Sequence, residues 1–283
     1  MRNLYIRLAT ALFFLITEVG LSATHDDSAV ESEALIPLAL LELSTSSDLV
    51  LIGEVHGTKQ IPVLLSKFVQ SIAVQGKSIS LGLEVLDELS PHFDDFIDTD
   101  CSDHSTSGFL ELEWWNPRKQ DGRRSRAFLD LLVNLRILKN RYPGKIHVYF
   151  YNAFSREYSE REALMANNVY EKVQSLKADV NVVLSGRIHT GTKKGLPYDL
   201  HTKSMGEHLV SMLPTTKSVL LTYSGGKRWA CSTDYCGASS VPAMLVSNKS
   251  SVNQIGVLMD ENLRHDFFWH IGVVDASPPA NLD

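Results

Sequence analysis

Short apolar runs alternate with amphipathic segments along most of this chain, and this alternation constrains its fold most strongly. The runs are rich in Val, Ile and Leu and are bounded by Gly or polar residues, which is typical of buried strands. Strands in alternation with helices favour a mostly parallel sheet with helices on both faces. The predicted strands span 48–55, 78–85, 145–152, 180–189 and 218–224, and helical apolar faces fall within 61–72, 128–138 and 165–176.

No linker clearly separates two domains, so we expect one α/β domain over residues 24–283. The turn-rich segments 87–107 and 189–205 are expected to be loop excursions from it. Residues 241–276 indicate extended structure and loops, with a possible antiparallel edge. The chain has 283 residues, of which 44% are hydrophobic, which excludes disordered and collagen-like classes.

The N-terminus is typical of a secretory signal peptide over residues 1–23. Arg2 and Arg7 form a basic start, an apolar run covers 8–16, and cleavage is expected near Ala23. The run is well short of the ~20 residues that span a bilayer, although an amphipathic first helix or an uncleaved anchor is the alternative. We therefore expect an exported protein, periplasmic or secreted, that is not integral to a membrane.

The cysteines suit an exported protein. Cys231 and Cys236 have the spacing of a small loop-closing disulfide, and the competing interpretation, half of a metal site, lacks a second Cys pair. Cys101 is then a free thiol.

The net charge of the chain restricts the classes of partner that it can bind. The 27 Lys and Arg against 33 Asp and Glu give a net charge of −6, which argues against a nucleic-acid binder. The expected partner is a small-molecule ligand or substrate. The oligomeric state is not determined by the sequence.

Acidic and imidazole side chains follow three of the predicted strands. Glu54 and His56 end the first strand, Glu84 ends the second, and His189 follows the fourth. Ligands bind outside the carboxyl ends of parallel strands, so these four residues are expected at one rim of the sheet. The pattern Gly-x-(Val/Ile)-His occurs at both 53–56 and 186–189, which favours a quasi-symmetric site.

The same segments resemble the superfamily of erythromycin esterases and haem-binding ChaN-like proteins, and more distantly the TraB/Tiki group. The resemblance rests on Gly-Glu-Val-His-Gly at 53–57, Leu-Gly-Leu-Glu at 81–84, Gly-Arg-Ile-His at 186–189 and the segment 161–168, and it is strongest over residues 45–215. The chain departs from the common Gly-Asn-x-His pattern by carrying Arg187 in place of Asn. Arg187 and Arg161 are candidate substrate-binding residues, Arg161 by pairing with a carboxylate at the rim.

The esterase branch implies a hydrolase that needs no cofactor and cleaves ester or related acyl bonds. His56 is then the general base, oriented by Glu54 or Glu84, and His189 stabilises the oxyanion or protonates the leaving group. Helix capping and core hydrogen bonding are the alternative roles for these side chains.

The ChaN-like branch implies a haem- or iron-binding protein without catalytic activity. Its axial ligand is not identified by the sequence, and the tyrosine candidates are Tyr149, Tyr151, Tyr158, Tyr170 and Tyr198. A divalent-metal-dependent hydrolase that uses His56, His189, Glu54 and Glu84 is the third possibility. Whether the chain is an enzyme is therefore left open by its sequence.

A basic cluster and two tryptophans lie between the second and third predicted strands. The cluster comprises Arg118, Lys119, Arg123, Arg124 and Arg126, and it either meets an anionic ligand or forms a solvated helix start. Trp114 and Trp115 either wall a pocket or pack in the core.

Overall fold

The computed structural model describes residues 36–99, 103–116, 121–193, 195–231, 235–244 and 251–281. The predicted signal peptide, Cys101, Arg118 and Lys119 lie outside these residues. The described residues all belong to one compact unit. None of the helices they form is both long enough and apolar enough to cross a membrane.

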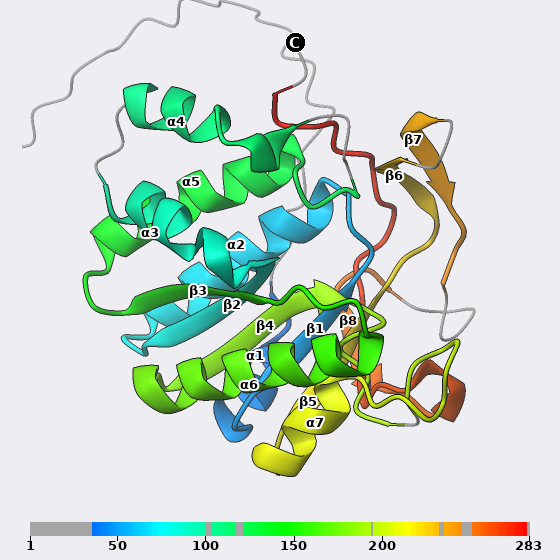
Figure 1. Cartoon of the computed structure of the whole chain (residues 1–283). Helices are drawn as coiled ribbons and strands as arrows, with labels where there is room; N and C mark the ends of the chain where they lie inside the picture. Colours follow the sequence, from blue (N-terminus) through cyan, green and yellow to red (C-terminus); the bar gives the residue numbers. More distant parts are fainter. Residues whose placement is uncertain are drawn as a thin grey trace, which may run out of the picture. The chain divides into compact units, whose positions relative to one another are not determined.

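A seven-stranded, mostly parallel sheet forms the centre of the fold and confirms the predicted α/β class (Figure 1). Each strand pairs with its neighbours in parallel, except β8, which runs antiparallel to β9 at the sheet edge. In sheet order the strands are β3 (Ile146–Asn152), β2 (Ile79–Leu86), β4 (Val180–Gly186), β1 (Val50–Glu54), β5 (Lys217–Thr222), β9 (Phe267–His270) and β8 (Gln254–Val257).

Helices pack on both faces of this sheet, as Figure 1 shows. Residues of β1 alternate between the two cores: Val50 and Ile52 enter the larger one, whereas Leu49, just before the strand, and Leu51 enter the smaller one. The larger core contains residues of α2 (Gln60–Val74), α3 (Ser90–Asp98) and α5 (Arg126–Arg141), and the smaller core contains those of α6 (Tyr158–Leu176) and α7 (Met205–Met212). A further helix, α1 (Leu38–Ser46), precedes β1.

The segment 87–107 differs from the predicted loop excursion, because most of its described residues are helical. They form η1 (Asp87–Leu89), α3 and the first part of α4 (Asp103–Leu110). Phe93 is fully buried and contacts Phe109 and Trp115, so aromatic packing stabilises a segment whose polar composition suggested turns. Trp115 is itself fully buried, which gives it the packing role. The second predicted excursion does form turns over 189–193 and 195–204.

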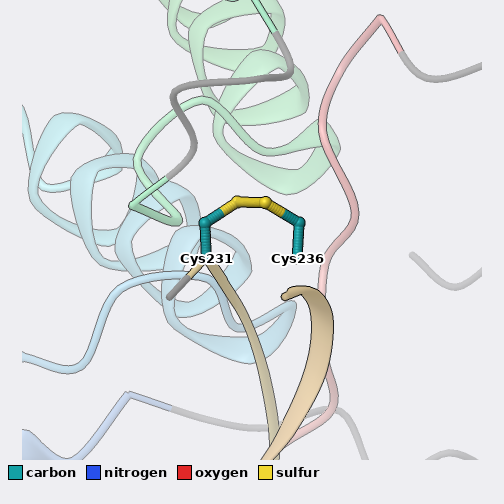
Figure 2. The surroundings of a disulfide bond; sticks show 2 residues. All are labelled: Cys231 and Cys236. Carbon is teal, nitrogen blue, oxygen red and sulfur yellow. A yellow bond between two sulfur atoms is a disulfide. The ribbon is translucent and has the colours of Figure 1, made fainter. Parts of the chain in front are cut away.

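A hairpin of β6 (Gly226–Cys231) and β7 (Cys236–Val241) forms a separate two-stranded sheet that the sequence did not reveal. The predicted disulfide between Cys231 and Cys236 joins the facing ends of its strands (Figure 2). The hairpin also bonds to the loop after β1, where the Trp229 amide donates to the Gly57 carbonyl over 2.8 Å. This attachment brings the hairpin to the carboxyl edge of the main sheet.

Candidate active site

Three adjacent strands, β2, β4 and β1, bring the motif residues together at their carboxyl ends. In the sheet register Glu54 lies opposite Gly186, and Leu83 lies opposite Leu184. Glu84 therefore ends beside the last residues of β4, although 100 residues separate it from them along the chain. The order of the strands thus explains how distant motifs share one site.

Glu54 and His56 form a hydrogen-bonded pair at the end of β1. The Nδ1 atom of His56 lies 2.9 Å from Oε1 of Glu54, and its Nε2 atom lies 3.6 Å from Oε2 of Glu84. Burial alone would lower the pKa of His56, but the carboxylate and hydrogen bond of Glu54, with the charge of Glu84, outweigh it and raise that pKa above 6.5. An Nδ1–H that donates to Glu54 leaves Nε2 as the proton acceptor.

Glu84 is the buried carboxylate at the centre of the site, with its side chain 5% exposed. Its Oε2 atom accepts hydrogen bonds from the Ser185 hydroxyl at 2.7 Å and the Gly186 amide at 2.8 Å. Its Oε1 atom accepts from Arg123 at 2.7 Å. Burial would raise the pKa of Glu84, but the Arg123 charge and these hydrogen bonds hold it well below its usual range, so Glu84 is ionised.

Arg123 belongs to the predicted basic cluster but has neither of the two roles considered for that cluster, because it pairs with two carboxylates of the protein. Its guanidinium is bound on one side by Glu84 and on the other by Asp121, whose carboxylate accepts from Nε at 2.9 Å and from Nη2. Burial opposes the charge, but these two carboxylates raise the pKa of Arg123. Arg126, in contrast, is an exposed residue at the start of α5 that pairs with Asp130.

His189 forms a second carboxylate–imidazole pair, with Glu162 of α6. Its Nδ1 atom lies 2.6 Å from Oε1 of Glu162, a fully buried carboxylate whose Oε2 accepts from the amide of Met205, the first residue of α7. The first amide of α7 thus helps to hold the Glu162 carboxylate in position. The two His motifs therefore share a local arrangement, in which a carboxylate orients Nδ1 of each imidazole.

Arg161 contacts both Glu84 and His189 and so links the two carboxylate–imidazole groups of the site. It donates through Nη2 to Oδ1 of Asn152 at 2.7 Å and reaches Oε1 of Glu84 at 3.5 Å. Its Nη1 atom lies 3.4 Å from Nε2 of His189. Arg161 thus does pair with a carboxylate at the rim, whereas a direct contact between it and a substrate stays a prediction.

A cavity of about 430 Å³ opens beside His56. Glu54, His56, Arg187 and His189 all line it, whereas Glu84 lines a different cavity, together with Arg123 and Arg161. The hairpin and the segment that follows it form another part of the wall. The remaining lining residues are Val55, Gly186, Ile188, Tyr223, Arg228, Ser240, Val241, Pro242, Ala243 and Met244.

The backbone conformation and the close packing of Gly57 explain why a glycine follows His56 in the motif. Its φ of +87° is unfavourable for residues with a side chain. A Cβ atom at this position would also lie 2.1 Å from the Trp229 carbonyl oxygen of β6. The glycine thus permits the close approach between the His56 loop and the hairpin.

The geometry does not favour a metal at the four motif residues. Among the described residues, no group of three or more His, Cys, Asp or Glu side chains is arranged to hold a metal ion. The carboxylate oxygens of Glu84 are directed instead at Ser185, Gly186 and Arg123. The donor set is thus committed to protein hydrogen bonds rather than converging on one point.

The five tyrosines considered as haem ligands do not line the cavity beside His56. Tyr149 and Tyr151 are buried, and the Tyr151 hydroxyl donates to the Leu184 carbonyl at 3.0 Å. Tyr158 and Tyr198 are exposed and pack edge to face. The phenol at the cavity is that of Tyr223, so the predicted tyrosine set does not fit a haem bound there.

Solved structures with the same fold include an erythromycin esterase, one of the two groups that the motifs resemble. A succinoglycan biosynthesis protein matches with a TM-score of 0.64 and 11% identity, over 85% of this chain and 91% of that one. The erythromycin esterase EreC, in its open conformation, matches with a TM-score of 0.54 and 10% identity, over 87% and 95%. ChaN of Campylobacter jejuni, with cofacially bound haem, matches with a TM-score of 0.41 and 12% identity, over 82% and 89%.

No protein-family model matches the chain, and no curated protein matches it either. At identities of 10–11%, the TM-scores of the first two matches show a shared fold alone. The chemistry must therefore be argued from the residues of this chain.

Several residues of the site were not predicted from the sequence. Glu162 adjoins Arg161 in a segment already recognised, so its proximity was a usable signal. Tyr223 stands at the end of the predicted strand 218–224, and that position was a usable signal. Arg228 carried none, because the hairpin that brings it to the cavity was not recognised. Arg123 was noted only as part of a basic cluster.

Proposed function

We propose that this protein is a hydrolase that cleaves ester or related acyl bonds, with His56 as the general base. The observation that carries the proposal is the Glu54–His56 hydrogen bond of 2.9 Å at the wall of a cavity. An imidazole whose Nδ1–H is fixed by a carboxylate presents Nε2 in a defined direction, which a proton acceptor requires.

His56 Nε2 removes a proton from a water molecule while the water oxygen attacks the acyl carbon. A new C–O bond forms, and the carbonyl electron pair moves to oxygen to give a tetrahedral oxyanion. When the oxyanion collapses, the bond to the leaving alkoxide breaks and the His56 imidazolium supplies its proton. The anionic Glu54 and Glu84 stabilise that imidazolium in the meantime.

His189 is the proposed stabiliser of the oxyanion. Its contact with the fully buried Glu162 orients the ring, and a ring that carries a proton on Nε2 can donate a hydrogen bond to the oxyanion. Arg161, 3.4 Å from that nitrogen, adds positive charge at the same place. One such donor contributes about 10²–10³-fold to the rate of acyl transfer.

We propose further that the protein is exported. The disulfide between Cys231 and Cys236 supports this, since such bonds persist mainly in oxidising compartments. The basic and apolar N-terminal sequence supports it independently.

Replacement of His56 tests the hydrolase proposal directly. Hydrolysis of 4-nitrophenyl acetate and butyrate should fall about 10²–10⁴-fold in His56→Ala, because the general base is lost. His201→Ala is the matched control, since His201 is exposed and does not line the cavity. Equal rates in the wild type and His56→Ala would remove His56 from catalysis. A saturable Soret shift with haemin, in a protein that hydrolyses neither ester, would favour the haem-binding alternative.

A further inference from the structure

Two arginines line the cavity beside His56 without taking part in the charge network around Glu84. Arg187 follows β4 directly, and Arg228 lies in β6 of the hairpin. They come from segments about 40 residues apart, and the docking of the hairpin brings them to the same cavity. The cavity wall thus contains two guanidinium groups that come from different segments of the chain.

Neither guanidinium has a carboxylate partner in the described part of the chain. The side-chain contact of Arg187 there is weak, since its Nη1 atom lies 3.8 Å from the sulfur of Met244. Arg228 is half-buried and forms no ion pair with a described residue. Arg123 and Arg161, in contrast, both contact Glu84. Arg187 is exposed, whereas Arg228 is a half-buried arginine without a counter-charge among the described residues, an arrangement that favours the binding of an anion.

Tyr223 supplies a hydroxyl close to these two charges. The side chain is buried and lines the same cavity. Burial raises the pKa of Tyr223, and the charges of Arg187 and Arg228 act in the opposite direction, which places both within electrostatic reach of the phenol. A protonated phenol can donate a hydrogen bond to an anion held by the arginines.

Apolar side chains fill the space around these polar groups. Ile188, Val241, Pro242 and Met244 line the cavity beside them. The combination suits a ligand with a short apolar body and an anionic end. A fully polar ligand would leave these apolar surfaces without a partner.

We propose that Arg187 and Arg228, with the Tyr223 hydroxyl, bind an anionic oxygen group on the substrate, so that the enzyme acts on esters that carry a carboxylate or a phosphate. This inference rests on the proposed hydrolase function for the position of the reacting bond, but not for the anion site itself. A guanidinium forms paired hydrogen bonds with either group.

Binding of three matched probes to the full chain tests the anion site without reference to catalysis. Isothermal titration with phenylacetate, phenyl phosphate and the neutral phenylacetamide should give at least tenfold tighter binding for one or both anions. The double variant Arg187→Gln, Arg228→Gln should lose that preference, whereas Arg141→Gln, at the exposed end of α5, should retain it. The tighter of the two anions identifies the group as carboxylate or phosphate. Equal binding of all three probes, or a preference that survives the double variant, would overturn the inference.

A pair of esters separates this inference from the proposed function. The wild type should hydrolyse 4-nitrophenyl hemisuccinate with a kcat/KM about tenfold or more above that for 4-nitrophenyl butyrate. The double variant should lose the difference between the two esters. If neither ester is hydrolysed while the anionic probes still bind through the arginines, the hydrolase proposal fails and the anion site stands. If both esters are hydrolysed equally by both proteins, the anion site fails alone.

Discussion

Arginines occur in two contrasting environments on either side of this site. Arg123 and Arg161 contact Glu84, and further hydrogen bonds to Asp121 and Asn152 hold them in place. Arg187 and Arg228 line the cavity and lack a carboxylate partner among the described residues. The first pair orients the groups proposed for catalysis, and the second is open to a ligand.

The difference follows from where the residues originate. Arg161 lies on α6, which packs on the main sheet, and Arg123 lies just before α5. Arg187 and Arg228 lie in a turn and in a hairpin outside that sheet. In the proposed function, the sheet thus fixes the groups proposed for catalysis in place, and the peripheral segments provide the surface proposed to select the substrate.

The largest expected effect comes from removing the charge at the centre of the first environment. Glu84→Gln would leave Arg123 with only Asp121 and Arg161 without a carboxylate, so the free energy of unfolding should fall by about 3–5 kcal/mol. Urea denaturation measures this change, and ester turnover at a temperature where the variant is folded should also fall. Glu88→Gln is the control, since Glu88 is exposed. A variant as stable as the wild type would show that the buried charges do not depend on Glu84.

The pH dependence of kcat/KM and of stability tests the proposed role of Glu54. Because the pKa of His56 is raised above 6.5, its base form, and therefore kcat/KM, should increase with pH through that raised value. The stability that the protonated pair provides behaves in the opposite way: it is complete below 6.5 and is lost as pH rises through the raised pKa.

Glu54→Gln should shift the rising limb of the rate profile to lower pH, since the carboxylate that raises the pKa of His56 is gone. Glu42→Gln, at an exposed position of α1, should leave the profile in place. A limb whose midpoint does not move in Glu54→Gln would contradict the proposed coupling.

The smallest effect is expected at the hairpin. The double variant Cys231→Ser, Cys236→Ser opens a short loop, which should lower the free energy of unfolding by about 2 kcal/mol at most. Turnover of the neutral ester should persist, because the main sheet holds His56 and Glu84. The preference for the anionic ester should weaken, because Arg228 lies on the same hairpin. If the cysteine variant lost as much neutral-ester turnover as His56→Ala, the groups on the main sheet would depend on the hairpin for their position.

Local signals predicted the sheet and the ends of its strands well. The run at 145–152 and the strand β3 differ by one residue, since hydrophobic periodicity directly reflects burial on a pleated surface. The run at 180–189 was too long: β4 ends at Gly186, and His189 lies in the following turn. The helical content of 87–107 was missed because contacts among distant aromatic residues, rather than local propensity, stabilise it.

The sequence by itself determined the α/β class and the four side chains expected at the carboxyl edge of the sheet. Tertiary structure alone decided their partners: Glu84 with Arg123, His189 with Glu162, and Arg228 at the cavity. The physical reason is that strand order and the docking of the hairpin set the distances between residues far apart in the chain. Periodicity within one segment contains no information about those distances.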